Sequence, residues 1–241
     1  MLKPLTVVLL LILPLCLIAQ EKAAENNLPT KGLVAYYPFN GNTKDESGNG
    51  FHLTADGCEL VQDRFTFGNK AYSFDGSVSR MMADIKGKFP VQQLTLSAWI
   101  YYRGGGAENP RIIAVSEGKT NIHTYSLIVN RDDGRLWFYT GTTGNDLHGN
   151  KRIIEKVWHH VAVTYDGREV RIYQDGILDQ RTYVYFKLEP LRDGYLMISH
   201  SDKEGLLNDL FPGIIDDIRI YNQALDETEV HQLYHEGAWK Q

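Results

Sequence analysis

Two stretches of the chain carry oxygen-bearing side chains that could bind a hard cation. The first is a glycine-rich loop that contains Asn40, Asn42, Asp45, Glu46 and Ser47. The second is the adjacent pair Asp216 and Asp217, in an apolar stretch near the C-terminus. Calcium takes six to eight oxygen ligands, backbone carbonyls included, and tolerates irregular geometry. Together the two stretches predict a calcium site.

The same residues have a second interpretation as ordinary turn formers. Asp, Asn, Ser and Gly populate loops because they hydrogen-bond to the nearby backbone and accept unusual φ values. Asp216 and Asp217 are also neighbours in a predicted strand, so their side chains should point to opposite faces. At most one of them could then reach a given ion, and the calcium and turn interpretations both stay open.

Aromatic side chains alternate with aliphatic ones in two stretches. In residues 135–140, Trp137 and Tyr139 fall on the face opposite the aliphatic side chains, and in residues 94–102 Trp99 does the same. If the aliphatic faces form a core, the aromatic faces could stack on sugar rings. The alternative is that both faces are buried, which is what we expect of Trp99. Trp137 and Tyr139 are therefore candidate ligand-binding residues.

A polar, glycine-rich segment over residues 140–152 is predicted to be a loop between two strands. Loops on a rigid sandwich are where ligand contacts usually lie. Asn145, Asp146 and His148 in this segment are candidate ligand-binding residues, and so is Arg111, which follows a run of three glycines. An ordinary solvated loop is the alternative.

Motifs for transition metals and for nucleophilic catalysis are absent from the sequence. His159 and His160 are adjacent in a predicted strand and should point to opposite faces. We expect one of them to pack in the core with Trp158 and the other to meet solvent. The chain has no His-Glu-x-x-His motif, no paired-cysteine motif and no Gly-x-Ser-x-Gly motif. No catalytic residue is predicted.

The elements that would position these side chains are mostly strands. The alternation of apolar and polar residues predicts strands over 94–102, 125–130, 135–140, 159–166, 169–175, 195–199 and 213–221. Asp-Gly pairs at 133–134, 166–167 and 175–176 predict tight hairpin turns, because glycine adopts the positive φ that such turns require. Many short strands with almost no helix predict an all-β sandwich or barrel.

One short helix is predicted near the C-terminus. Asp226 is a good N-cap residue and Glu229 follows three positions later, so the two can form a capping box. Val230, Leu233 and Tyr234 then form an apolar stripe. We expect this helix to pack on the edge of the sandwich.

Five blocks of the sequence resemble, in order, the laminin-G-like, concanavalin A-like lectin family. They are residues 32–54, 71–82, 94–102, 158–176 and 213–230, the last reading GIIDDIRIYNQALDETEV. The resemblance implies a two-sheet antiparallel jelly-roll sandwich with adjacent first and last strands. It also implies a fold used for carbohydrate binding, adhesion and, in some relatives, glycoside hydrolysis. We predict a single domain of this class over residues 32–241, with one short C-terminal helix.

The resemblance also bears on the candidate sites. In relatives of this fold a structural calcium commonly joins the first loop to the final strand, and the matching positions are Asp45 and Asp216, with Asp217 as the alternate. The retaining glucanases that share the architecture carry Glu-x-Asp-x-(x)-Glu on one strand. No glutamate of this chain is followed two positions later by aspartate. This favours a non-catalytic protein and leaves open only a catalytic pair drawn from distant strands.

The first residues indicate export. Lys3 precedes a largely apolar stretch over residues 5–18, and Ala19 is a small residue where cleavage could occur. This predicts a signal peptide over residues 1–19, followed by a polar linker over residues 20–31. The protein is therefore expected to be secreted or periplasmic. A retained N-terminal anchor is the alternative.

The two cysteines add little to this picture. Cys16 could carry a lipid anchor, but Leu15 stands before it where such a signal needs a small residue, so no anchor is expected. After cleavage only Cys58 remains, and it cannot form an internal disulfide. The fold must then depend on its hydrophobic core.

The overall charge excludes one class of partner. A formal net charge of −5 with scattered Lys and Arg gives no basic patch for nucleic acid. We predict a secreted, non-catalytic module that recognises a carbohydrate or a glycosylated surface and holds a structural calcium, with no membrane span in the mature chain. Two alternatives stay open: a glycoside hydrolase with an unrecognised carboxylate pair, and a protein-binding adhesion domain without a sugar site.

Overall fold

The computed structural model describes residues 28–86, 88–117, 122–141, 146–188, 194–203 and 206–239. The predicted signal peptide, residues 20–27 of the predicted linker and the candidate residue Asn145 lie outside the described residues. Among the described helices, none has the length and hydropathy that crossing a membrane requires.

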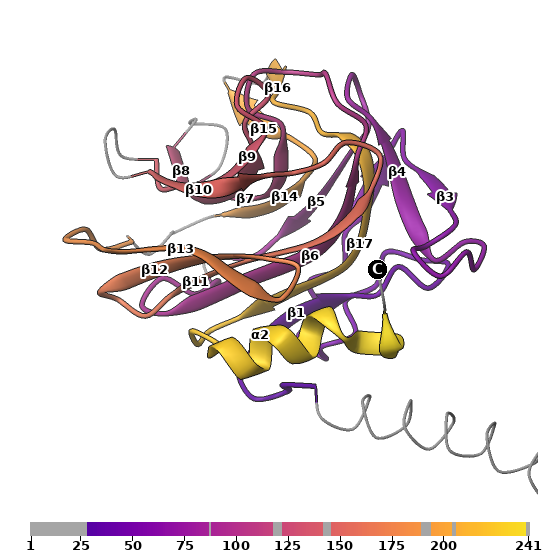
Figure 1. Cartoon of the computed structure of the whole chain (residues 1–241). Coiled ribbons are helices and arrows are strands. Elements are labelled where there is room, and N and C mark those ends of the chain that lie inside the picture. Colours follow the sequence, from indigo (N-terminus) through magenta and orange to yellow (C-terminus); the bar gives the residue numbers. More distant parts are fainter. Residues whose placement is uncertain are drawn as a thin grey trace, which may run out of the picture.

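Two antiparallel sheets pack face to face (Figure 1). The eight-stranded sheet has the order β13 (Ile177–Tyr183), β12 (Glu169–Gln174), β11 (Trp158–Tyr165), β6 (Leu94–Tyr102), β17 (Pro212–Tyr221), β4 (Ala71–Asp75) and β3 (Glu59–Val61), with β1 (Leu33–Tyr37) also paired to β17. The seven-stranded sheet has the order β10 (Leu147–Arg152), β9 (Arg135–Tyr139), β8 (Ile122–Val129), β7 (Arg111–Glu117), β14 (Tyr195–Ile198), β5 (Arg80–Asp84) and β2 (Thr54–Asp56). A separate hairpin joins β15 (Ser201–Lys203) to β16 (Leu206–Asn208). The predicted two-sheet sandwich, with its first and last strands adjacent, is confirmed.

Alternate side chains of both sheets form one hydrophobic core. In β6, Leu96 and Ile100 point into it and are fully buried, together with Leu127 and Phe138 of the seven-stranded sheet. Burying each such side chain contributes roughly 1.5–3 kcal/mol. The core therefore holds the sheets together without a disulfide, and Cys58 is free.

The predicted hairpin turns are confirmed, but the predicted loop is partly a strand. Gly134, Gly167 and Gly176 all have positive φ, at 69°, 91° and 72°. The prediction of a loop throughout residues 140–152 is wrong, because β10 pairs with β9 over residues 147–152. Only Leu147 and a glycine are buried in this edge strand, so its composition carries little strand signal.

The predicted helix is α2 (Glu227–Tyr234), which is followed by the short 3₁₀ helix η1 (Glu236–Ala238). The backbone N–H of Glu229 donates to the Asp226 carboxylate and the backbone N–H of Asp226 donates to the Glu229 carboxylate, each at 2.9 Å, which confirms the capping box. The helix lies against the outer face of the eight-stranded sheet (Figure 1). Tyr234 stacks there on Trp99, whose ring is fully buried as expected.

The last residues of the predicted linker also pack on this face. The Tyr221 hydroxyl donates to the backbone oxygen of Pro29 at 3.0 Å, and Leu28 contacts the apolar cluster beneath α2. Leu28 and Pro29, near the end of the predicted linker, therefore contact the sandwich.

Candidate functional site

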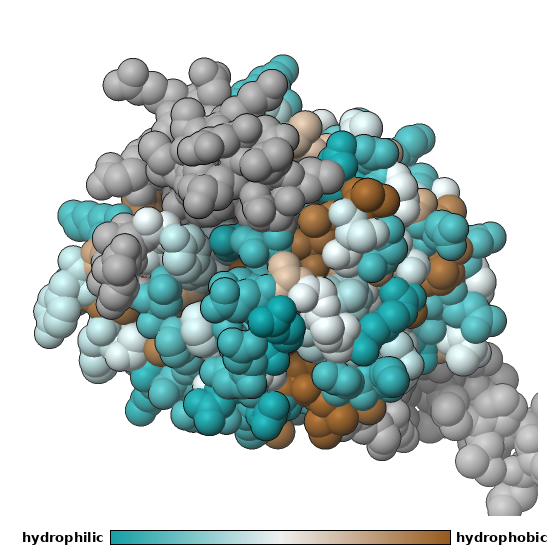
Figure 2. All heavy atoms as spheres, turned by 90° about the horizontal axis from the view of Figure 1, so that it is seen from above, coloured by the Kyte–Doolittle hydropathy of each residue, from teal (hydrophilic) through white to brown (hydrophobic). Residues whose placement is uncertain are grey.

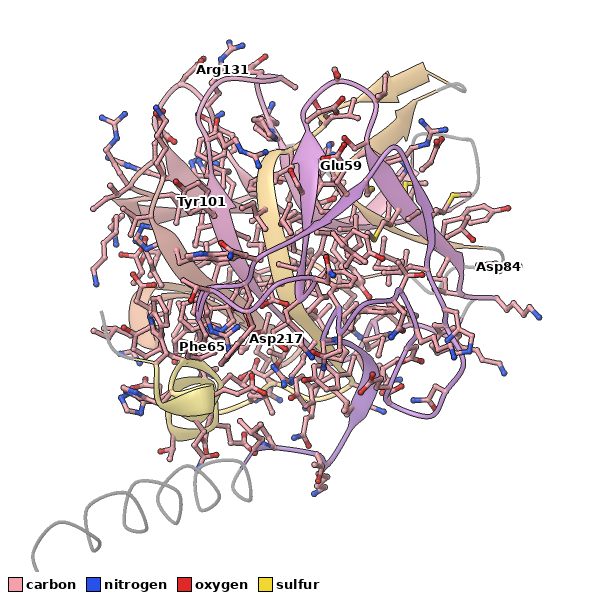
Figure 3. The ribbon with its side chains drawn as sticks, turned by 90° about the vertical axis from the view of Figure 1, so that its right-hand side faces the viewer. Glu59, Phe65, Asp84, Tyr101, Arg131 and Asp217 are labelled. Carbon is pink, nitrogen blue, oxygen red and sulfur yellow. The ribbon has the colours of Figure 1, made fainter. Side chains whose placement is uncertain are left out.

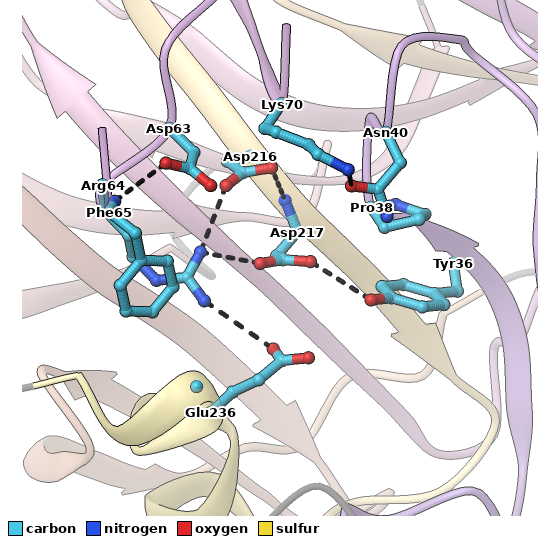
Figure 4. A pocket seen from close by; sticks show the side chains of 11 residues that line it. Tyr36, Pro38, Asn40, Asp63, Arg64, Phe65, Lys70, Asp216, Asp217 and Glu236 are labelled. Atoms are coloured by element: carbon cyan, nitrogen blue, oxygen red, sulfur yellow. Dashed lines mark hydrogen bonds and ion pairs between the residues drawn. The ribbon is translucent and has the colours of Figure 1, made fainter. Parts of the chain in front are cut away.

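A polar pocket of about 230 Å³ lies where the first loop, the last strand and the C-terminal turn meet (Figure 4). This is the junction at which the sequence predicts calcium. Phe65 and Asp217, both of which line the pocket, lie beside the C-terminal helix in Figure 3. We call the charged side chains around it the Arg64 cluster: Arg64, Asp216, Asp217, Arg219 and Glu236.

A β-bulge turns both strand aspartates towards the same partner. The register of β17 against β6 shifts between Asp216 and Arg219, and Asp217 has a φ of 47°. The Nη1 atom of Arg64 lies 3.1 Å from Asp216 Oδ2 and 2.7 Å from Asp217 Oδ2. The expectation that these two side chains point to opposite faces is therefore wrong, because a residue in the left-handed region breaks the strand's period of two.

The guanidinium of Arg64 is buried among these groups. Its side chain is 2% exposed, and its Cζ atom lies 4.5 Å from the ring centroids of both Phe65 and Trp99. Glu236 approaches its Nη2 atom at 4.0 Å. The aromatic rings and the carboxylates together stabilise the buried positive charge.

Arg219 is the second arginine of the cluster, which also holds three carboxylates. It binds Glu236 through two hydrogen bonds of 2.8 and 2.6 Å and lies 4.0 Å over the ring of Tyr36. The Tyr36 hydroxyl in turn donates to Asp217 at 3.2 Å. Burial, together with the negative charge of Asp217, raises the pKa of both Asp216 and Glu236.

The third predicted calcium ligand, Asp45, stabilises its own loop through hydrogen bonds. Asp45 accepts three backbone N–H groups, from Tyr36, Ser47 and Phe51, at distances of 2.9 to 3.0 Å. Phe51 and Tyr36 are thereby tied to the same carboxylate, which fixes the loop against β1. This is the role of a turn former.

The predicted ligand set does not fit a calcium ion in this arrangement. Every carboxylate oxygen of Asp45, Asp216 and Asp217 accepts a hydrogen bond or an ion pair from the chain itself. The described residues contain no group of three or more His, Cys, Asp or Glu side chains placed to hold a metal. Calcium needs six to eight oxygens, and the two strand carboxylates already share one guanidinium.

The other candidate residues gather on the outer face of the seven-stranded sheet. The strand registers place them in two rows that cross β7, β8 and β9. One row is Ala114, Ser126 and Tyr139, and the other is Arg111, Ile128, Trp137 and His148. We call these seven residues the Arg111 face, together with Thr140, Asp146 and Asp209 beside them. Where residues are coloured, the view from above in Figure 2 is mainly hydrophilic, with small separate apolar areas.

Arg111 is the buried charge of this face. Its Nε atom donates to Asp209 Oδ2 at 3.2 Å, and its Cζ atom lies 5.2 Å from the centroid of the Tyr139 ring. Its side chain is 8% exposed, and burial lowers its pKa. Its Nη1 atom is buried without a hydrogen-bond partner among the described residues.

Two hydroxyls on or just after the neighbouring strands are also buried without hydrogen-bond partners in the described part of the chain. They are Ser126 Oγ and Thr140 Oγ1. Ser126 pairs directly with Tyr139, and Thr140 follows Tyr139 in sequence. The backbone N–H of Thr140 donates to Asp146 at 3.3 Å, and burial raises the pKa of that carboxyl.

The ring of Trp137 has only part of its surface available for stacking on a sugar. Its ring is stacked by His148, with centroids 3.8 Å apart and planes 12° from parallel. Its indole N–H donates to Asp133 at 3.4 Å. One face of the ring is therefore covered by a strand neighbour, and His148 is part of the aromatic surface rather than of a loop.

The structure thus brings together five of the six predicted ligand-binding residues, and the sixth, Asn145, lies outside the described residues. Sequence reasoning missed Ser126, Thr140 and Asp209. Small hydroxyl residues are common in strands, and Asp209 lies 98 positions from its partner Arg111. No sequence signal distinguishes these three residues.

The adjacent histidines do point to different partners, but neither meets solvent. His159 pairs with Asp175 at 2.8 Å, and His160 contacts Ser97 Oγ at 2.8 Å. They are 2% and 1% exposed, so the expectation that one of them is exposed is wrong. Helix α2 covers the face on which His160 lies, and burial there lowers its pKa to about 3.

A family model agrees with this architecture. The model described as the concanavalin A-like lectin/glucanases superfamily matches residues 63–231. A comparison with curated proteins found no match.

Solved structures show the same fold. Domain 4 of AbnA, a GH43 extracellular arabinanase from Geobacillus stearothermophilus, solved with arabinotriose, is 21% identical with a TM-score of 0.69, and the match covers 84% of this chain and 98% of that one. The binding domain of botulinum neurotoxin DC, solved with rat synaptotagmin II, is 15% identical with a TM-score of 0.65, over 86% of this chain and 52% of that one. The same toxin domain solved with SialylT is 15% identical with a TM-score of 0.66, and the match covers 87% of this chain and 52% of that one.

The chain thus spans about half of the toxin binding domains. At these identities the likeness is one of fold, and the family match shows that the chain belongs to the concanavalin A-like lectin/glucanases superfamily.

Proposed function

We propose that this chain is a secreted, non-catalytic carbohydrate-binding domain that holds a saccharide on the Arg111 face. The observation that carries the proposal is that Arg111 Nη1 and, on or just after the neighbouring strands, Ser126 Oγ and Thr140 Oγ1 are buried without hydrogen-bond partners among the described residues. A buried polar group left unpaired costs about 1–3 kcal/mol. The hydroxyls of a sugar can donate to and accept from such groups.

The charges around Arg111 favour a neutral sugar. Asp209 already pairs with the guanidinium, and the negative charge of Asp146 acts on it as well. An anionic sugar would be repelled by the two carboxylates, whereas a neutral hydroxyl can accept from Nη1 without competing for charge. Arabinotriose, the ligand in the arabinanase domain structure, is a neutral oligosaccharide of this kind.

The aromatic rings of the face support the same proposal. Tyr139 lies beneath Arg111, and the stacked Trp137 and His148 extend the surface along the neighbouring row of the sheet. Aromatic side chains have an apolar face that can contact sugar C–H groups, while the neighbouring polar atoms fix the orientation of the ligand.

The test is a panel of neutral and acidic soluble oligosaccharides, with arabinotriose among the neutral probes, measured by titration calorimetry. The wild-type chain should bind at least one neutral probe, and Arg111→Gln should weaken that binding at least tenfold. Arg131→Gln is the matched control, because Arg131 is an exposed arginine whose side-chain partners among the described residues are its neighbour Asp132 and a backbone oxygen.

Two results would contradict the proposal. The first is the absence of binding to every oligosaccharide of the panel. The second is binding that Arg111→Gln and Arg131→Gln weaken equally. Selective binding of acidic probes would overturn the argument from Asp146 and Asp209.

A further inference from the structure

Two histidines of α2 face each other on the surface of the helix. His231 and His235 are one helical turn apart, so their side chains lie on the same face. Their Nε2 atoms are 3.1 Å apart, their ring centroids are 4.3 Å apart, and both residues are exposed. Neither ring belongs to the Arg111 face or to the Arg64 cluster.

The spacing of the two nitrogens matches a shared metal ion. A zinc ion holds histidine nitrogens at about 2.0–2.1 Å, so two such ligands at a tetrahedral angle lie about 3.3 Å apart. The observed 3.1 Å is close to that separation. Without an ion, the same distance requires one ring to donate an N–H to the lone pair of the other.

A carboxylate near the pair adds a negative charge that would attract a cation. An imidazole ligates through an unprotonated nitrogen. Glu227 lies one turn before His231 on the same helix face, and both line a shallow pocket of about 390 Å³. Its carboxylate adds negative charge beside the pair.

We propose that His231 and His235 form a two-histidine site for a divalent transition-metal ion of the class that imidazole prefers, such as Zn²⁺, Ni²⁺ or Cu²⁺. The described residues offer no third His, Cys, Asp or Glu placed to join them. Water would fill the remaining positions. Calcium, which prefers oxygen ligands, is not expected there.

An ion at this position would stabilise the C-terminal segment. His235 is the C-cap residue of α2, at which the chain turns towards Glu236 and Trp239. Glu236 binds Arg219, and the Trp239 ring packs on Trp99 at 5.3 Å. Fixing both rings of the last turn would therefore hold the segment that closes over the Arg64 cluster. The site does not depend on the proposed sugar-binding function.

The test measures the binding of Zn²⁺ to the full mature chain by titration calorimetry, and the effect of Zn²⁺ on the Tm by thermal unfolding. Zn²⁺ should bind to the wild-type chain and raise its Tm, because an ion that binds only the folded state stabilises it. His231→Gln and His235→Gln should each weaken binding at least tenfold and abolish the rise in Tm. Added Ca²⁺ should not replace Zn²⁺ at this site.

The matched control is His52→Gln. His52 is an exposed histidine whose ring accepts from the backbone N–H of Asp45 and has no second histidine beside it in the described structure. This variant should bind Zn²⁺ as the wild type does. Circular dichroism of the apo variants checks that each one folds.

The proposal is overturned if Zn²⁺ leaves the wild-type Tm unchanged, or if the two helix variants respond to Zn²⁺ like the wild type. Equal losses in His52→Gln and His231→Gln would also overturn it, because the ion would then bind elsewhere. In that case the contact between the rings is an N–H···N hydrogen bond only.

Discussion

The Arg64 cluster and the Arg111 face are each built around one buried arginine, and they differ in how fully that arginine is paired. Arg64 contacts three carboxylates and two aromatic rings, and it shares two of those carboxylates, Asp217 and Glu236, with Arg219. Arg111 has one carboxylate and one ring among the described residues. Each guanidinium keeps one buried nitrogen without a partner in the described structure, Nε in Arg64 and Nη1 in Arg111, but only Arg111 has unpaired hydroxyls on or just after the neighbouring strands. The first arginine is engaged in holding the fold together. The second has hydrogen-bonding capacity left for a ligand.

The difference follows from position in the fold. The Arg64 cluster lies where the two ends of the domain meet, in contact with β17 and with the turn after α2. A buried charge at that place stabilises the fold, because its ion pairs connect elements that are distant in sequence. The Arg111 face lies on the outer surface of a sheet, where side chains in cross-strand rows cannot satisfy one another completely. Pairing with several carboxylates from distant elements therefore marks a structural role, and a singly paired charge beside unpaired buried hydroxyls marks a candidate binding surface.

The largest expected effect is on stability, from Arg64→Met. The substitution keeps an unbranched apolar stem but removes the positive charge between Asp216 and Asp217. Removing one partner of a buried ion pair costs about 3–5 kcal/mol, because it leaves uncompensated buried charge. Urea unfolding of the variant, of the wild type and of the exposed control Arg131→Met measures the loss. A loss below about 1 kcal/mol would contradict the structural role of Arg64, since that is the size expected for an exposed pair.

Arg111→Met should cost less than Arg64→Met. The side chain has fewer partners to leave unpaired, and Asp209 is 24% exposed, so water can solvate that carboxylate after the change. We expect a loss of about 1.5–3 kcal/mol, the range for a hydrogen bond to a charged group. The same urea experiment checks the order of the two variants. Equal losses of unfolding free energy in the two variants would contradict the view that Arg64 contributes more to stability than Arg111.

Much of the fold could be predicted from the sequence because its signals are local. The alternation in β6, the glycine at 134 and the Asp226–Glu229 capping box each depend on a few adjacent residues, and each is confirmed. β10 was missed because an edge strand with one buried apolar side chain needs no alternating pattern.

The sites were predicted less completely, because they depend on long-range packing. The bulge at Asp217 brings both carboxylates to Arg64, which is 153 residues away in the sequence. Arg64 itself follows Asp63 in a segment with no pattern that would indicate a buried cation. The rows of the Arg111 face were partly predictable, since Trp137 and Tyr139 alternate with core residues. Ser126 and Thr140 can be related to the other candidate residues only when the strand register is known.

A smaller effect is expected in the pH dependence of stability. Burial, followed by the charge of Asp217, raises the pKa of Asp216 above its ordinary value of 3.8. The folded chain then binds this proton more tightly than the unfolded chain, so the free energy of unfolding falls as the pH rises from 3.8 towards the raised pKa. Asp216→Asn cannot titrate, and its free energy of unfolding should therefore decline less steeply over that range.

Urea unfolding at several pH values checks this slope. Asp132→Asn, an exposed aspartate beside Arg131, is the control and should follow the wild type. A steeper decline in Asp216→Asn than in the wild type would contradict the assignment of the raised pKa to this carboxyl.

The smallest expected effect is that of calcium, which the sequence predicts at Asp45 and Asp216. Because Arg64 already provides the positive charge between Asp216 and Asp217, and Asp45 is engaged by three backbone N–H groups, we expect the Tm to be unchanged in EGTA and on adding Ca²⁺. Thermal unfolding of the wild type and of Asp45→Asn in both conditions measures this. A Tm that falls in EGTA and recovers with Ca²⁺ would support the calcium prediction instead, because a bound ion stabilises the folded state by mass action. It would also mean that carboxylates already paired with protein groups can still take a ligand, which is the possibility that the contrast between Arg64 and Arg111 excludes.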